Sequence, residues 1–163
     1  PFNVGYDFNH ESDFTKQFVN RVTEYWIQEY HIDGFRFDLS KGFTQKFSNN
    51  DGVFAAYDQS RIDILKEYAD HIWSIDSDSY VILEHFASNT EEKVLAAHGM
   101  MLWSNHNHAI NEGTLGFNAN GASNFEWIDY KEKEWDNPHV LPMMSKTLPL
   151  HWKGSKWQVH FST

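Results

Sequence analysis

The sequence predicts an α/β fold built on a parallel sheet, and three observations support this prediction. Helical and strand-like stretches alternate along the chain as far as Trp103. Such alternation is typical of parallel sheets, because each return to the same end of the sheet needs a crossover, usually a helix. The 163 residues are about the size of one ordinary domain, and the hydrophobic fraction of 40% is enough for a core.

Composition excludes several classes of protein. Thirteen basic and 23 acidic side chains give a net charge of −10, which argues against nucleic acids and anionic membranes as partners. No apolar run approaches the roughly 20 residues of a membrane helix. The absence of cysteine excludes a disulfide scaffold, a thiol nucleophile and a Cys-based zinc site. The 13 Phe, 7 Tyr and 7 Trp residues provide flat faces that suit sugar rings, although such residues also fill cores.

The first predicted element is a helix that begins at Ser12 or Asp13, since either side chain can cap a helix N-terminus. Its apolar side is a strict i,i+4 row of Phe14, Phe18, Val22, Trp26 and Tyr30. The next segment, 32–38, alternates in the manner of a strand. Segment 39–57 is rich in Gly, Ser and Asn, which is typical of a loop.

A second helix is predicted to begin at Asp58, with an apolar face that runs from Ile62 to Trp73. The polar segment 76–79 ends this helix. Segment 80–84 is then a compact apolar strand.

Asn89 and Glu92 resemble a capping box, which predicts a third helix that stops at Gly99. Segment 100–103 is predicted as another strand. The chain beyond it is loop-rich, with one short helix expected near 125–134.

Two of the predicted strands end in a carboxylate, Asp38 and Glu84, and a loop follows each. In parallel α/β folds, sites are built at the carboxyl ends of the strands. The two acids are 46 positions apart, whereas one strand–helix unit of an eight-stranded barrel takes about 31 residues. One such unit together with the long loop 39–57 accounts for this spacing. We therefore expect both carboxylates at the same end of the barrel, where the strands have their carboxyl ends.

The residues around these acids suit chemistry at a glycosidic bond. Arg36 and Asp38 share one face of their strand, while Phe35 and Phe37 share the other. A guanidinium beside a carboxylate keeps it ionised and oriented, as a nucleophile must be. Glu84 follows three apolar residues, a setting that favours the protonated form a general acid needs. The alternative is a structural Arg–Asp pair with an unrelated Glu at the end of a strand.

The separation of the two carboxyl groups would decide the stereochemical outcome. A gap of about 5 Å makes a retaining glycosidase, and one of about 6.5–9.5 Å an inverting one. Sequence alone leaves this distance open.

The segment 33–38, DGFRFD, resembles the second signature region of the α-amylase family of glycoside hydrolases, and 81–84, VILE, resembles the third. The segments NVGYDFNHES, DLSKGFTQ and YVILEHFA, in that order, are similar to bacterial α-amylases of the Bacteroidetes type. The similarity covers roughly residues 1–139. It implies a partial (β/α)8 TIM barrel, from about helix 3 through strand 6 plus the following loops.

The resemblance also implies roles for individual residues. Asp38 would be the nucleophile, Glu84 the acid/base, and Arg36 the residue that orients Asp38. Lys41 lies where the family often has a substrate-contacting lysine. Trp103, at the end of its predicted strand, is a candidate for stacking on a sugar ring, and packing in the core is an equal alternative.

The sequence departs from the family pattern in three places. Gly42 stands four positions after the nucleophile, where the family often has His. The family's first region, with an Asn that often binds calcium, would precede residue 1, so calcium is an expectation for a longer parent protein only. The fourth region should supply His-Asp after 138–139, and the third catalytic Asp is missing there. We therefore expect no turnover from this chain alone, and turnover once its flanking sequence is restored.

No metal ligands and no cofactor are predicted within the chain itself. His106 and His108 alternate in a manner that could suit a metal, but no carboxylate lies near them. They are better interpreted as polar loop residues.

Residues 140–163 differ abruptly in composition from the preceding chain and are interpreted as an atypical tail. Met143 and Met144 can only be encoded as ATGATG, whose shifted frame contains an Asp codon. Neighbouring codons allow His before that Asp and Glu after it, which is the missing motif. We interpret the tail as read out of frame from a change near Val140, with a divergent natural terminus as the alternative. The underlying DNA sequence distinguishes the two.

These observations predict a retaining glycoside hydrolase that cleaves α-1,4-glucosidic bonds in starch-like α-glucans and maltooligosaccharides. A transglycosylase or branching enzyme of the same superfamily would share both acids. A non-catalytic glucan-binding relic, or an unrelated barrel with a coincidental GFRFD, are further alternatives. The resemblance favours an extracellular or periplasmic parent protein. We also expect poor solubility, because a partial barrel leaves open sheet edges.

Overall fold

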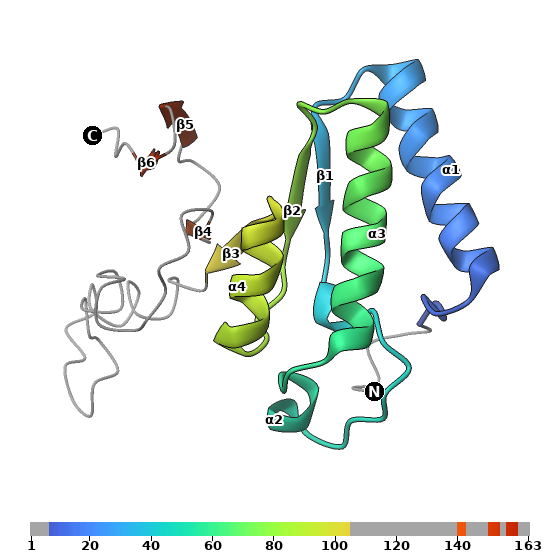
Figure 1. Cartoon of the computed structure of the whole chain (residues 1–163), viewed down its shortest axis with the longest axis vertical. Helices are drawn as coiled ribbons and strands as arrows, with labels where there is room; N and C mark the ends of the chain where they lie inside the picture. The colour runs from blue at the N-terminus through green and yellow to red at the C-terminus, as the bar shows by residue number, and fades with distance from the viewer. Residues whose placement is uncertain (1–6, 105–139, 143–149, 154–155, 160–163) are drawn as a thin grey trace, which may run out of the picture.

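The computed structural model describes residues 7–104, 140–142, 150–153 and 156–159. Figure 1 shows a small sheet with helices packed against it. The elements in chain order are α1 (Asp13–Tyr30), β1 (Gly34–Phe37), the 3-10 helix η1 (Ser40–Gly42), α2 (Asp51–Phe54), α3 (Gln59–Ile75), β2 (Tyr80–Leu83), α4 (Asn89–His98), β3 (Met101–Ser104), β4 (Val140–Pro142), β5 (Leu150–Lys153) and β6 (Lys156–Val159).

The principal sheet has the order β1-β2-β3-β4, and each neighbouring pair is parallel. Gly34 pairs with Tyr80 and Phe37 with Leu83, so β1 and β2 end at the same level. Strands β5 and β6 form a separate antiparallel pair. The alternation of helices with parallel strands is therefore present in the described residues. Closure of these strands into an eight-stranded barrel stays a prediction.

The two long helices begin at the predicted residues, but only one of the two starts is capped by a side chain. Ser12 is the N-cap residue of α1 and its side chain makes no cap hydrogen bond. Asp58 is the N-cap of α3, where its carboxylate accepts a hydrogen bond from the Ser60 amide at 3.0 Å. Both starts agree with the sequence prediction. The capping box predicted from Asn89 and Glu92 is wrong. The N-cap of α4 is Ser88, whose side chain accepts a hydrogen bond from the Glu91 amide.

The core lies between α3, α4 and the sheet (Figure 1). Its α3 side is the predicted apolar face, with Ile62, Leu65, Ala69 and Ile72 all buried. The sheet and α4 contribute Val81, Leu83, Leu95, Met100 and Leu102. Phe35 and Phe37, which alternation places on one face of β1, pack against this cluster. Their burial turns the other face of β1, which carries Arg36, away from the core.

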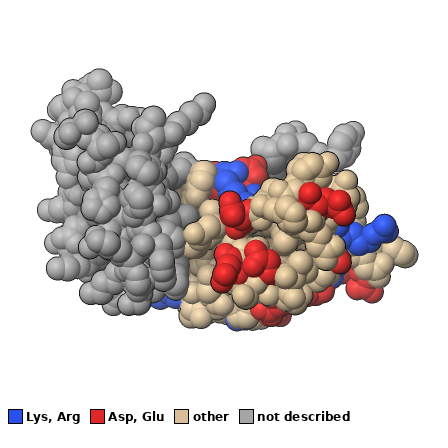
Figure 2. Space-filling view, turned by 90° about the horizontal axis from the view of Figure 1, so that it is seen from above, with Lys and Arg blue, Asp and Glu red and all other residues tan. Residues whose placement is uncertain are grey.

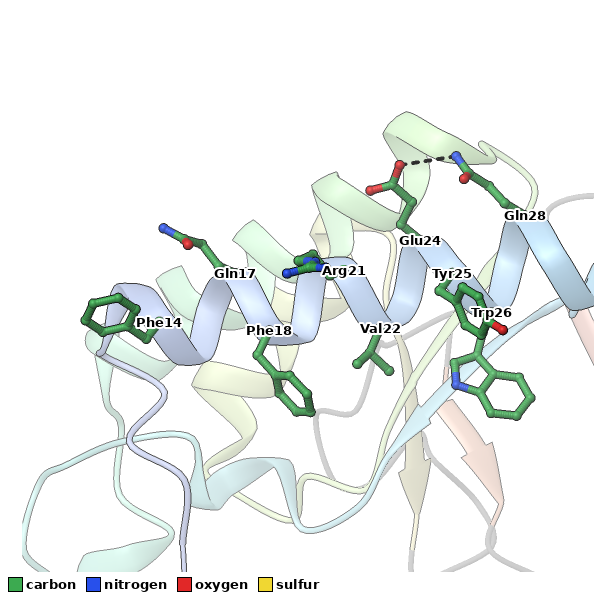
Figure 3. Close-up of a pocket in the computed structure, with 9 residues that line it drawn as sticks. All are labelled: Phe14, Gln17, Phe18, Arg21, Val22, Glu24, Tyr25, Trp26 and Gln28. Carbon is green, nitrogen blue, oxygen red and sulfur yellow. Dashed lines mark hydrogen bonds between the residues drawn. The ribbon is translucent and has the colours of Figure 1, made fainter.

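The aromatic row of α1 lies on the surface of the described part of the chain. Phe14 is 85% exposed, and Phe18, Trp26 and Tyr30 are also exposed. Figure 3 shows Phe14, Phe18, Val22 and Trp26 projecting from one side of α1. The helix reaches the core through Ile27 instead.

The segment 39–57, predicted as a loop, contains two short helical pieces, η1 and α2. The Asn50 side chain accepts a hydrogen bond from the Val53 amide at 3.0 Å, which caps α2. This local cap explains why a helical turn forms within a segment of loop-like composition.

The start of β1 requires glycine. Gly34 has φ +151°, and a Cβ atom there would lie 2.2 Å from the carbonyl oxygen of Tyr80. This close approach brings β1 beside β2 and so brings the ends of the two strands together.

Acidic side chains are spread over the described part of the face in Figure 2, with fewer basic ones among them. None of the helices within the described residues is long and apolar enough to cross a membrane.

Candidate active site

Arg36 joins the two candidate acids at the carboxyl ends of β1 and β2. Its Nη1 lies 2.7 Å from Asp38 Oδ1, and its Nη2 lies 2.7 Å from Glu84 Oε2. Each carboxylate thus uses a different nitrogen of one guanidinium. The structure brings together residues that are 46 positions apart in the chain, and the parallel register of β1 and β2 is the reason.

Backbone hydrogen bonds fix the two segments that follow the strands. The Glu84 amide donates to Phe37 O at 3.0 Å, and the Ser40 amide donates to Glu84 O at 2.9 Å. The Leu39 amide also points at the acid itself, 3.3 Å from Glu84 Oε2. Hydrogen bonds to Glu84 therefore hold the turn that follows Asp38 in place.

Two residues beside the acids have left-handed backbone conformations. Leu39, directly after Asp38, has φ 44°, and Phe86, two residues after Glu84, has φ 51°. Such conformations cost about 1–2 kcal/mol for a residue other than glycine. They persist only where the surrounding structure enforces them, and they cluster at functional sites.

Asp38 is open to solvent, with 76% of its side chain exposed. The hydrogen bond from Arg36, followed by one with the Glu84 carboxyl group, lowers the pKa of Asp38 below its ordinary value. An ionised, accessible carboxylate is the state in which a nucleophile reacts.

The setting of Glu84 differs from the expectation. Val81 and Leu83 are buried in the core, and the alternation of the strand places Glu84 on the opposite face. Its carboxylate there contacts the Arg36 guanidinium and the Leu39 amide. Of the three apolar residues before Glu84 only Ile82 shares its face, and Arg36 and the Leu39 amide add polar contacts that the sequence did not predict.

Trp103 belongs to the same site, whereas the side chain of Lys41 has other partners. The Arg36 guanidinium lies over the Trp103 ring, with Cζ 4.2 Å from the ring centroid. The Lys41 ammonium is 3.0 Å from Asp51 Oδ1, and it lies over the Phe54 ring. The Lys41 side chain is mostly buried by these contacts. Its predicted contact with substrate stays a prediction.

Sequence reasoning missed a buried polar group beneath the acids, formed by Ser40, Arg61, His85 and Glu91. His85 directly follows Glu84, and Ser40 lies two residues after Asp38. All four side chains are nearly or completely inaccessible to solvent. The available signal for Arg61 was its place directly before the predicted apolar face of α3, four positions before Leu65 on the same side of the helix.

The described residues contain no group of three or more His, Asp or Glu side chains able to hold a metal ion. His106, His108 and the helix expected near 125–134 lie outside the described residues.

No family model matches the chain, and no curated protein matches it. The likeness to α-amylases therefore depends on the motifs around Asp38 and Glu84.

Proposed function

We propose that this chain carries the nucleophile and the acid/base of a retaining glycoside hydrolase that cleaves α-1,4 bonds in starch-like glucans. The observation that supports this most directly is the bridge from Arg36 to Asp38 and Glu84. Two carboxyl groups held by one guanidinium suit the short separation of a retaining enzyme. The family motifs around them suggest the α-glucan substrate.

The proposed reaction has two steps. In the first, an Asp38 oxygen attacks the anomeric carbon, the bond to the leaving oxygen breaks, and Glu84 gives that oxygen its proton. In the second, water attacks the anomeric carbon, its proton passes to Glu84, and the bond to Asp38 breaks. Both acids end in their starting state, and the anomeric configuration is retained.

Arg36 has a positioning role in this proposal. Its contacts with both acids hold them on the same side of the sheet, and they favour the ionised form of Asp38. Trp103 lies beside Arg36, and the flat apolar surface of an indole suits the apolar face of a sugar ring.

The test is hydrolysis of maltooligosaccharides, by this chain and by a longer chain that includes the flanking coding sequence. We expect turnover from the longer chain, and proton NMR of the first product should show retained α configuration. Glu84→Gln should lower kcat by about 10²–10⁴-fold. Asp38→Ala should lower it by about 10⁴-fold or more.

Azide rescue assigns the two roles separately. With an activated α-glycosyl substrate, azide should restore turnover in Asp38→Ala as the β-glycosyl azide, because azide then replaces the nucleophile. In Glu84→Ala the rescued product should be the α-glycosyl azide, because azide attacks the covalent intermediate. Products of inverted configuration from the unchanged enzyme would contradict the proposal, as would full activity without Asp38. Elongated glucans formed with an acceptor sugar would identify a transglycosylase instead.

A further inference from the structure

A hydrogen-bonded chain of buried side chains lies directly beneath the two acids. Ser40 Oγ is 2.9 Å from His85 Nδ1, and His85 Nε2 is 2.7 Å from Glu91 Oε1. Ser40, His85 and Glu91 are each 0% exposed. This chain links the turn after Asp38 to the residue after Glu84 and to the first turn of α4.

Arg61 fixes the charge at the far end of this chain. Its guanidinium contacts both carboxylate oxygens of Glu91, with Nη2 2.8 Å from Oε2. It also donates to three backbone carbonyl oxygens, those of Lys41, Phe54 and Ala56. Burial opposes ionisation of Glu91, but the hydrogen bonds from His85 and Arg61 outweigh it and lower the pKa of Glu91.

The direction of each hydrogen bond follows from these charges. Burial lowers the pKa of His85, so the ring is neutral at neutral pH. Because Glu91 can only accept, the His85 proton lies on Nε2 and is donated to Glu91. The free Nδ1 then accepts from the Ser40 hydroxyl. All three groups are satisfied in one arrangement, which gives the turn a defined geometry.

Ser40 connects this buried chain to the backbone of Glu84, the proposed acid/base. Its amide donates to Glu84 O at 2.9 Å. Its single hydroxyl proton is donated to His85 Nδ1, so the hydroxyl oxygen, 3.2 Å from the same carbonyl oxygen, makes no second hydrogen bond there. The hydroxyl is enclosed, so it cannot act as a nucleophile despite its resemblance to a serine–histidine–acid arrangement. Ser40 contacts the backbone of the acid/base rather than a substrate.

We propose that the buried chain Ser40–His85–Glu91 is a positioning device that sets where the Glu84 carboxyl group stands relative to Asp38. Arg36 holds the two carboxyl groups from the open side, and the buried chain holds their backbone from the core side. This inference rests on the proposed function, since it assigns the device to the acid/base step.

The test compares Ser40→Ala with Ser79→Ala in the longer chain that includes the flanking sequence. Ser79 is also buried, but its hydroxyl bonds to Asp76 at the opposite end of β2. Two substrates are used, a maltooligosaccharide and α-maltosyl fluoride. The fluoride needs no proton from the enzyme to leave, so kcat/KM on this substrate, which reports only the steps up to fluoride departure, does not depend on proton transfer by Glu84. Cleavage of the maltooligosaccharide does depend on it.

We expect Ser40→Ala to lower kcat on the maltooligosaccharide by about tenfold or more. On α-maltosyl fluoride its kcat/KM should stay within about twofold of the unchanged enzyme, and Ser79→Ala should be unaffected on both substrates. Equal losses on the two substrates would overturn the inference, because they would indicate a general structural defect. Unchanged activity on both would overturn it as well.

A second measurement needs no turnover and uses the 163-residue chain. The Asp38 carboxyl group is titrated by carbon NMR in the unchanged chain and in both serine variants. Displacement of Glu84 should move the Asp38 midpoint upward in Ser40→Ala alone. An identical midpoint in all three chains would overturn the inference. If the longer unchanged chain hydrolyses neither substrate, the proposed function is contradicted, and this titration still decides the positioning role.

Discussion

The molecule contains two arginine–carboxylate groups of similar chemistry but opposite surroundings. In the first, Arg36 bridges Asp38 and Glu84 at the open ends of the strands. In the second, Arg61 grips Glu91 within the core. Asp38 is 76% exposed, whereas the Glu91 side chain is 0% exposed. The same pair of functional groups thus serves an accessible site in one place and a rigid support in the other.

Burial decides what each group contributes to stability. Exposed ion pairs contribute roughly 0–1 kcal/mol, because water screens them. Removal of one partner from a buried pair costs about 3–5 kcal/mol, because the other charge is left without compensation. The open group can therefore exchange partners with a ligand, and the buried group cannot.

The largest expected effect is that of Arg61→Met, which leaves Glu91 in the core without its positively charged partner, with only the neutral His85 ring still donating to it. We expect a loss of about 3–5 kcal/mol in the free energy of unfolding. Urea denaturation followed by circular dichroism measures it. A loss below about 1 kcal/mol would show that burial does not distinguish the two groups.

Glu92, beside Glu91, is also buried, but its carboxyl group accepts from a backbone amide where Glu91 has an arginine. Burial, with a smaller contribution from the Glu91 charge, raises its pKa to about 7, although the Ala87 amide donates to its carboxyl group. Between about pH 4.5 and 7 the folded state keeps a proton that the unfolded state loses. Stability should therefore fall as the pH rises through this window, by roughly 3 kcal/mol from this group.

Glu92→Gln should remove that loss. The variant should match the unchanged chain near pH 4 and exceed its stability at pH 8. Urea midpoints measured at both pH values test this, with the exposed Glu67→Gln as the control. A constant difference between Glu92→Gln and the unchanged chain at both pH values would contradict the role assigned to Glu92.

Arg36→Met is the counterpart of Arg61→Met at the open site. The loss of stability should be below about 1 kcal/mol, because solvent screens the pair. The pKa of Asp38 should rise toward its ordinary value, since Arg36 is the main cause of its lowering. The small contribution of Asp38 is present above about pH 4 and lost as the pH falls through its folded-state pKa. Carbon NMR titration checks the rise, and an unchanged Asp38 midpoint would disprove it.

The smallest effect is expected at Lys16, whose ammonium lies 2.6 Å from Glu67 Oε2 between α1 and α3. Lys16→Met should change the free energy of unfolding by less than about 0.5 kcal/mol, because the Glu67 side chain is 47% exposed and water screens the pair. A change of more than about 1 kcal/mol in urea denaturation would indicate that exposure is a poor guide to these contributions.

Local sequence signals predicted much of the fold. Ser12 and Asp58 marked the starts of two long helices, and alternation placed Phe35 and Phe37 on the face of β1 opposite to that of Arg36. The rule that sites occupy the carboxyl ends of parallel strands placed Asp38 and Glu84 together. These predictions succeeded because each depends on the chain's immediate neighbourhood or on one general rule of topology.

The features that escaped prediction depend on contacts between distant segments. The buried chain joins Ser40, His85 and Glu91 with Arg61, and each comes from a different element or turn. Their pairing is not visible from spacing in one segment. The polar contacts of Glu84 escaped prediction for a related reason, since the guanidinium that contacts it comes from the neighbouring strand.

The contact between Arg36 and Trp103 has a consequence for ligand binding. With Arg36 Cζ 4.2 Å from the ring centroid, the guanidinium occupies one face of the indole. A sugar ring cannot stack on that face while the guanidinium remains there. A sugar ring that stacks on this face must displace the guanidinium from the indole. Its binding is therefore linked thermodynamically to the contacts of Arg36 with Asp38 and Glu84.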